Sequence, residues 1–245
     1  MRTARITVVF LALAGLCPTS QVRADDGMVR LRGIVTNVDY TLQYDDSTTS
    51  RAGTSRFTAA GLGLTYVWSG GMYADAKYLT SSNATHDYWR TAGFASLPLE
   101  RADTTLTWGY TTADLWNVHA ALQNGKTKRT NQPGNLEQSR TLTTQGVVAG
   151  GGKGFATGIG VFGVNGTVGL VSGTLDTSTG VSSKADSALA LSAGASYAYP
   201  YSRNLVFGAD AKLQKFTLDF GKGGANAFSY AETIKSLSIY IAGQF

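Results

Sequence analysis

The sequence predicts an all-β fold, an antiparallel transmembrane up-and-down β-barrel of about ten strands. Three observations predict it. Segments of about 11–18 residues alternate apolar with small or polar residues. The spacers between them are alternately short and long, and the less apolar face of the segments carries few charges. Strands with two different faces, joined in this asymmetric way, are typical of barrels that cross a membrane.

The alternation has a period of two, which is the repeat of an extended strand. One example places Leu62, Leu64, Tyr66 and Trp68 between Gly61, Gly63, Thr65 and Val67. The same pattern returns in 105–110, 116–123 and 189–197. No segment repeats apolar residues at a sustained helical spacing, so no substantial helix is expected.

The chemistry of the two faces indicates which one meets lipid. In a soluble β-sandwich the apolar face forms the core and the opposite face carries charges. Here one face carries Leu, Val, Ile and aromatic residues, while the other is mostly Gly, Ala, Ser and Thr. This inversion favours lipid outside and a narrow polar lumen inside. Closure into a barrel also satisfies the backbone amides, which cost several kcal/mol each when unpaired in hydrocarbon.

The pattern predicts ten strands, with eight or twelve as alternatives if a segment is not in the membrane or a hairpin lies within 83–101. The strands are expected at 28–44, 54–68, 71–82, 102–112, 115–126, 139–153, 159–173, 184–199, 204–219 and 229–245. Short spacers are 69–70, 113–114, 154–158 and 200–203; long ones are 45–53, 83–101, 127–138, 174–183 and 220–228. An even count places both termini on the side of the short turns.

The N-terminal residues 1–24 have the organisation of a cleaved signal peptide. A basic start with Arg2 and Arg5 precedes the apolar stretch Ile6 to Leu16, and Val22-Arg23-Ala24 is similar to a small-residue cleavage site. A lipoprotein signal cleaved before Cys17 is the alternative, with Leu16 where a small residue is preferred. Residues 25–245 are then the barrel domain.

Removal of this segment changes the charge and the cysteine count. The remaining chain has 18 basic and 16 acidic residues, a net charge of +2, and no cysteine. A basic patch with interleaved aromatic residues, as nucleic-acid binding needs, does not remain. Disulfides and thiolate metal sites are excluded as well, and no cofactor is expected.

Aromatic residues near the short turns predict a girdle at one membrane interface. They share the outward parity and cluster at one level of the strands. The girdle candidates are Trp68, Trp108, Trp116, Tyr197 and Phe207.

The last ten residues, Ser236 to Phe245, end in a terminal phenylalanine. Leu237, Ile239 and Ile241 stand at alternate positions before Phe245, with Gly243 as the weak member. This stretch resembles the C-terminal assembly signal of Gram-negative outer-membrane barrels, and the hairpin 105–122 is similar to those of small porin-like proteins of that class. The resemblance implies an outer-membrane location, lipid and lipopolysaccharide as partners, and the barrel assembly machinery during biogenesis. It covers a broad class and names no single family.

Charged residues with lumen parity are the candidates for a functional site. They are Arg32, Asp39, Asp75, Lys77, His119, Asp210 and Lys212. They form either a salt-bridged polar filling or a charged constriction that selects a solute. Residues 30–44 do not keep one alternation throughout, which a β-bulge would explain.

An enzyme is not expected. The chain has two histidines, His86 in a predicted loop and His119 with lumen parity. Outer-membrane hydrolases and acyltransferases need a histidine positioned against serine or aspartate. No sequence motif places His119 with such partners.

Four cations at the third predicted outer loop suggest contacts with lipopolysaccharide phosphates. They are Lys126, Lys128, Arg129 and Arg140.

The sequence thus predicts a porin-like or envelope-structural protein with a narrow polar lumen that passes or binds a small solute. Adhesion through long outer loops and a lipid-modifying enzyme are the alternatives. The solute is not indicated.

Overall fold

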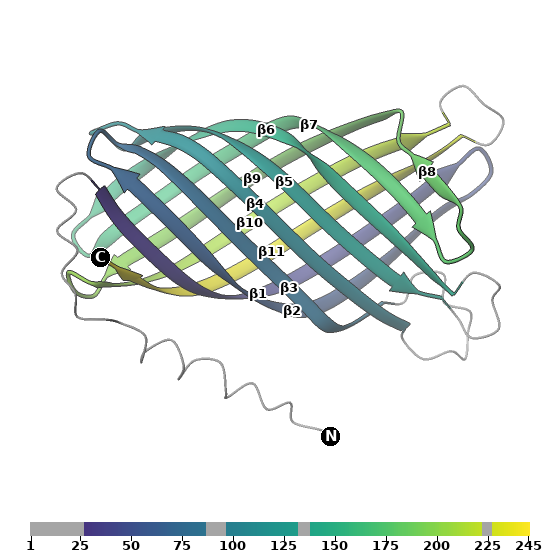
Figure 1. Ribbon diagram of the computed structural model, residues 1–245, viewed down its shortest axis with the longest axis horizontal. Helices are drawn as coiled ribbons and strands as arrows, with labels where there is room; N and C mark the ends of the chain where they lie inside the picture. Colours follow the sequence, from purple (N-terminus) through teal and green to yellow (C-terminus); the bar gives the residue numbers. More distant parts are fainter. Residues whose placement is uncertain (1–26, 87–96, 132–137, 222–226) are drawn as a thin grey trace, which may run out of the picture.

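The computed structural model describes residues 27–86, 97–131, 138–221 and 227–245, which form a closed β-barrel (Figure 1). The expected signal peptide 1–24 lies outside the described residues. No helix in the described ranges is long and apolar enough to cross a membrane. The strands are β1 (Gly27–Asp46), β2 (Ser50–Trp68), β3 (Met72–His86), β4 (Leu97–Thr111), β5 (Trp116–Thr130), β6 (Ser139–Thr157), β7 (Gly160–Thr177), β8 (Ser182–Lys184), β9 (Ser187–Pro200), β10 (Leu205–Phe220) and β11 (Phe228–Gln244).

The barrel consists of ten long antiparallel strands, and β8 is a three-residue addition paired with β7. Consecutive long strands are neighbours, and the ring closes between β1 and β11. The pairing of β6 with β7 joins the two halves. A closed ring has no sheet edge, so its backbone groups pair within the sheet. The prediction of a ten-stranded antiparallel barrel is confirmed.

Both ends of the described chain lie at the same end of the barrel, called here the terminus end (Figure 1). The amide of Val29 donates to the carbonyl of Phe245 at 3.0 Å, and the amide of Phe245 donates to Val29 at 2.9 Å. The connections at this end are short: 69–71, 112–115, 158–159 and 201–204. Gly71 adopts a φ of 85° in the first of them, a conformation that favours glycine.

The strands extend further at the far end than the alternation predicts. Residues 45–53, expected as a long loop, are mostly strand, and only 47–49 connect β1 to β2. The expected loop 83–101 likewise includes the end of β3 and the start of β4, and 127–130 belong to β5. These segments escape the prediction because their outward residues are polar, so the alternation of a membrane strand is absent.

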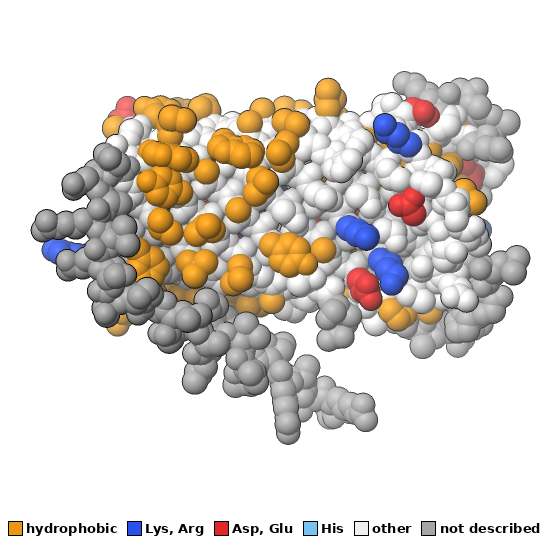
Figure 2. Space-filling view, viewed as in Figure 1, with side chains coloured by type: hydrophobic (Ala, Val, Ile, Leu, Met, Phe, Trp, Pro, Cys, Tyr) orange, Lys and Arg blue, Asp and Glu red, His pale blue; other side chains and the backbone are white. Residues whose placement is uncertain are grey.

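Exposed apolar side chains form a belt on the terminus half of the barrel (Figure 2). In β5 the outward residues are apolar from Trp116 to Leu122 and polar from Asn124 onward. A tilted strand needs about 9–11 residues to cross the hydrocarbon core. The strands have up to 20 residues, so the belt is a membrane-spanning region and the far half projects beyond it. Charged side chains gather on that projecting half (Figure 2).

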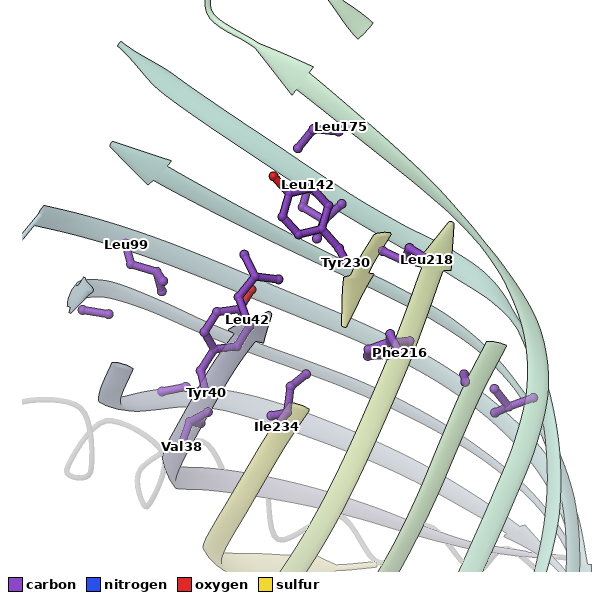
Figure 3. Packing of buried hydrophobic residues seen from close by; sticks show 14 of the residues in the cluster. Val38, Tyr40, Leu42, Leu99, Leu142, Leu175, Phe216, Leu218, Tyr230 and Ile234 are labelled. Carbon is purple, nitrogen blue, oxygen red and sulfur yellow. The ribbon is translucent and has the colours of Figure 1, made fainter. Parts of the chain in front are cut away.

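The inward side chains also change polarity at this level of the barrel: they are polar inside the belt and apolar inside the projecting half. In β1 the inward residues are polar at Arg30 and Arg32 and become apolar at Val38, Tyr40 and Leu42. Side chains from the other strands join these in one buried cluster (Figure 3), which includes Leu99, Leu142, Leu175, Phe216, Leu218, Phe220, Tyr230 and Ile234. The expectation of a polar lumen is therefore wrong for the far half. Beyond the belt the outer wall faces water, so the barrel there is built like a soluble one, with an apolar core.

Candidate functional site

The terminus half of the lumen contains a polar cavity of about 490 Å³. Its lining runs from the strand ends at Val67, Thr111 and Asn117 to Lys77 and Lys212 further inside. Ligand pockets in proteins typically have volumes of about 300–1,000 Å³. The cavity is large enough for a small solute and begins at the mouth of the barrel.

Six of the seven lumen candidates line this cavity: Arg32, Asp75, Lys77, His119, Asp210 and Lys212. They come from β1, β3, β5 and β10, where the residues between them face outward. The alternation of those four strands thus brings these side chains together.

The placement of Asp39 in the lumen is wrong. Asp39 pairs across the strands with Arg56, and the two side chains form an ion pair of 2.6 Å with 51% and 86% exposure on the outside of the barrel. The pairing of β1 with both neighbours is continuous, so the expected bulge is absent there. The even residues of β1 all face inward, and the alternation is lost in the sequence because the interior turns apolar beyond Thr36. A register shift occurs instead in β3, between Ser81 and Ala84.

Arg32 and Asp75 form a salt bridge inside the cavity. Thr65 donates to the same carboxylate oxygen at 2.6 Å, and the Arg32 guanidinium lies 5.9 Å from the ring centre of Tyr240. Both charged side chains are more than four-fifths buried, so pairing offsets the cost of removing them from water.

His119 contacts an amide rather than an acid. Its Nδ1 lies 2.8 Å from Oδ1 of Asn117, whose amide nitrogen donates to the hydroxyl of Tyr73 at 3.1 Å. His86, the other histidine, lies at the far end of β3 with Nε2 at 3.1 Å from the carbonyl oxygen of Thr130. The hydrogen bond of the His119 ring is therefore with the amide of Asn117.

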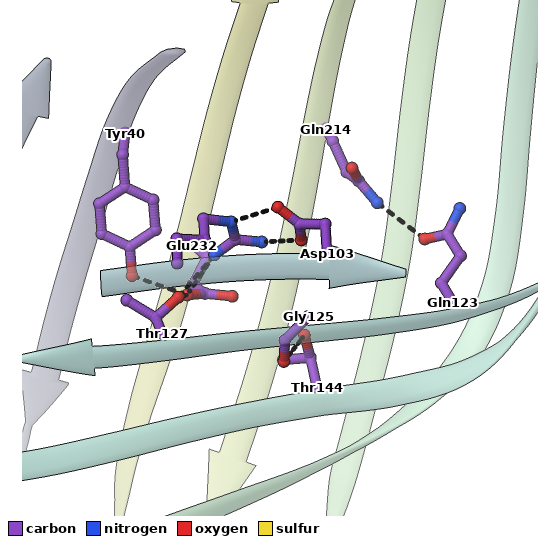
Figure 4. A network of polar contacts seen from close by, with 9 residues as sticks. Tyr40, Asp103, Gln123, Gly125, Thr127, Thr144, Gln214 and Glu232 are labelled. Atoms are coloured by element: carbon purple, nitrogen blue, oxygen red, sulfur yellow. Dashed lines mark hydrogen bonds and ion pairs between the residues drawn. The ribbon is translucent and has the colours of Figure 1, made fainter. Parts of the chain in front are cut away.

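A network of charged and polar side chains crosses the lumen beyond the inner end of the cavity, and Figure 4 shows its contacts. Glu232 of β11 accepts hydrogen bonds from Tyr40 at 2.6 Å and Thr127 at 3.2 Å, and pairs with Arg101 at 3.4 Å. Arg101 also donates to both oxygens of Asp103 at 2.8 and 2.9 Å. Arg101 and Glu232 are 3% and 1% exposed. The network joins β1, β4, β5 and β11, so it crosses the lumen from wall to wall.

Sequence reasoning missed this network. Arg101 falls in the expected loop 83–101, and Glu232 was not selected although it shares the parity of Ser236 and Ser238. That shared parity is the signal by which Glu232 could have been found. A further crossing lies close by, where Gln214 donates to Gln123 at 2.7 Å (Figure 4). The space left between these layers is about 60 Å³.

The four cations predicted to contact lipopolysaccharide do not share one surface. Lys126 and Lys128 face outward from β5, and Lys128 lies 3.8 Å from Glu100. Arg129 and Arg140 face inward, which corrects their assignment as surface cations. The Arg129 guanidinium lies 5.8 Å from the ring centre of Tyr230, and Arg140 donates to the Tyr230 hydroxyl at 3.4 Å. The four residues lie in β5 and β6, where alternation separates neighbours onto opposite faces.

The girdle candidates Trp68, Trp108, Trp116, Tyr197 and Phe207 all have outward parity near the terminus end. Leu237, Ile239 and Ile241 lie on the outer face of β11, and Phe245 follows its last residue. Their role as an assembly signal stays a prediction. In the described ranges no group of three or more His, Cys, Asp or Glu residues could hold a metal ion.

Comparisons with known proteins find similar structures and no similar sequence. No protein-family model matches the chain, and no curated protein matches it. The outer membrane protease OmpT from Escherichia coli aligns over 90% of this chain and 97% of its own, with a TM-score of 0.59 and 6% identity. The translocator domain of the autotransporter NalP from Neisseria meningitidis covers 88% of both chains (TM-score 0.49, 15% identity). Neisserial surface protein A covers 89% of this chain and 97% of its own (TM-score 0.40, 12% identity).

The likeness to OmpT shows that the chain has the fold of an outer-membrane β-barrel. At 6% identity it shows the fold alone.

Proposed function

We propose that the chain is a Gram-negative outer-membrane β-barrel that does not conduct and holds a small polar solute in a cavity open to the periplasm. The observation that carries the proposal is the division of the lumen: the terminus half is polar and hollow, and the far half is filled. Short turns are typical of the periplasmic end of such barrels, and longer connections of the outer end. This pattern assigns the terminus end, and therefore the mouth of the cavity, to the periplasm.

Three features argue against an open pore. The salt-bridged network at Arg101 and Glu232 crosses the lumen. The apolar cluster fills the projecting half beyond it. A ten-stranded barrel is also close to the size at which side chains fill the interior, well below that of the aqueous porins. Binding or an envelope-structural role thus fits the filled lumen better than free passage.

Planar-bilayer recording tests this function. The purified barrel should insert without producing stable conductance steps, because no continuous water path crosses the apolar cluster. A conducting porin reconstituted in the same way verifies that insertion is detectable. Regular ohmic steps from the full chain would contradict the proposal and restore the porin-like alternative.

The proposal includes no enzymatic step. His119 lies against Asn117, and the acids nearest to it in the cavity lining, Asp75 and Asp210, form no hydrogen bond with it in the described ranges. Adhesion through the outer connections stays a prediction, since residues 87–96 and 132–137 lie outside the described residues.

Lys126 and Lys128 are proposed to bind lipopolysaccharide phosphates at the outer margin of the belt. Both lie on β5 just beyond Leu122, and the exposed pair of Lys128 with Glu100 is weak. A cation near an anionic membrane surface contributes about 1 kcal/mol, so replacing both lysines by glutamine should weaken binding by roughly 25-fold.

Lipopolysaccharide titrated into the detergent-solubilised barrel measures this effect. The matched control replaces Lys153 and Arg203 by glutamine, which removes the same charge at the terminus end. Equal losses in both double variants would reject a specific contact on β5.

A further inference from the structure

Two lysines face each other across the inner part of the cavity. Lys77 extends from β3 and Lys212 from β10, four strand steps apart around the ring of ten. Both also line the small space of about 60 Å³ below the Arg101 network. Both side chains thus line the same two adjoining spaces of the lumen. They therefore form the inner wall of the cavity, where a solute entering from the terminus end would stop.

Neither lysine is neutralised by a direct partner. Among the described residues, Lys77 and Lys212 form no side-chain hydrogen bond and no ion pair within 4.0 Å. Asp210 attracts both lysines and Asp103 attracts Lys212, but Asp210 forms no ion pair and Asp103 is paired with Arg101. Asp75, the other acid in the cavity lining, is already paired with Arg32. Two like charges held in a membrane-enclosed space are unfavourable unless an anion compensates them.

The whole lining has an excess of positive charge. It contains Arg30, Arg32, Lys77 and Lys212 against Asp75 and Asp210, a net charge of +2 with His119 neutral. Low-dielectric walls lined with one sign of charge concentrate the field and attract the opposite ion. The cavity thus favours a small anion with two negative charges.

The residues beside the lysines carry hydrogen-bonding groups. Thr105 is the strand neighbour of Lys77, and Ser236 is that of Lys212. On their other sides stand Gly63, against which the Arg32 guanidinium packs, and Gly194. A Cβ at Gly194 would lie 3.1 Å from Oδ1 of Asn165, a residue that also lines the cavity. Lysine, hydroxyl and amide donors are the groups that commonly bind phosphate oxygens.

We propose that Lys77 and Lys212 form a binding site for a small phosphate or phosphate monoester that enters from the periplasm. This inference rests on the proposed function, because it names the class of solute held in the same cavity. The phosphate would lie between the two ammonium groups, with Thr105 and Ser236 beside it. Its charge would balance the excess of the lining.

Phosphate titration of the full chain in detergent micelles tests the site by calorimetry. Each of Lys77→Gln and Lys212→Gln should weaken the binding of inorganic phosphate by at least about tenfold, the effect of losing a charged hydrogen bond. Lys77→Arg, which keeps the charge, should bind within a few-fold of the unchanged chain. The control Lys215→Gln removes the same charge from the outer face of β10, the strand that carries Lys212, and should bind normally.

The probes distinguish the source and class of the anion. Glycerol 3-phosphate binding more tightly than inorganic phosphate identifies a monoester, and the reverse order identifies the free ion. Succinate binding at least as tightly as both phosphates would overturn the phosphate assignment. Undetectable phosphate binding, or equal binding by the unchanged chain and the two lumen variants, would overturn the site.

Two further measurements distinguish a failure of the phosphate site from misfolding of a variant and from a failure of the proposed closed lumen. Gel mobility before and after boiling verifies that each variant is folded. If one glutamine variant is unfolded, the site is tested by comparing the phosphate affinity of Lys77→Arg with that of the other glutamine variant. A conducting barrel would overturn the proposed closed lumen even if phosphate binds. A silent barrel without phosphate binding would overturn the phosphate site alone.

Discussion

Replacing Arg101 by leucine is expected to destabilise the folded barrel by about 3–5 kcal/mol, the usual cost of removing one partner of a buried ion pair. Glu232 is 1% exposed and would keep only the hydrogen bonds from Tyr40 and Thr127. Its negative charge would then be buried without a compensating cation in contact. Urea unfolding in detergent, followed by tryptophan fluorescence, measures the loss.

The double variant Arg101→Leu with Glu232→Leu provides the matched control. It removes both charges and places apolar side chains beside Tyr40 and the apolar cluster, so most of the stability should return. Asp103, which loses Arg101 in both variants, is 37% exposed and can be solvated. A double variant as unstable as the single one would show that the network acts through packing rather than through charge.

The sequence predicted the membrane half of the molecule better than the projecting half. Between Leu62 and Trp68 the outer face is apolar and the inner face small or polar, so the alternation is visible. Beyond the belt water lies outside and the apolar cluster inside, and the contrast between the faces reverses. This reversal occurs within β1 and explains the wrong placement of Asp39. A polar residue faces the lumen in the membrane half of the strand but faces outward in the projecting half.

The alternation within a strand predicts which side chains face the lumen, but not which of them meet across it. Parity within single strands selected Lys77, Asp210 and Lys212, which do line the cavity. It could not show that Arg101 meets Glu232, because that contact depends on the curvature of the ring and on three intervening strands. Arg129 was misplaced for a different reason: it was treated as a loop residue, where alternation does not apply, although β5 continues to Thr130.

An arginine placed on the apolar belt tests the membrane assignment itself. Ala120 lies on the outer face of β5, midway between Trp116 in the girdle and Asn124 at the margin of the belt, and its side chain is exposed. Arginine on the lipid face near the bilayer midplane costs about 2–4 kcal/mol. Ala120→Arg should therefore lower the free energy of unfolding by about that amount when urea unfolding is measured in phospholipid vesicles.

The control for this test lies on the same strand and the same face. Asn124→Arg adds an equal charge one alternate position beyond Leu122, at the margin of the belt, where the cost falls to about 0–1 kcal/mol. The difference between the two variants measures a gradient of polarity along the outside of β5. Equal effects at the two positions would mean that the outer face of β5 meets one uniform environment, and the apolar belt would then not be the part of the barrel that contacts lipid.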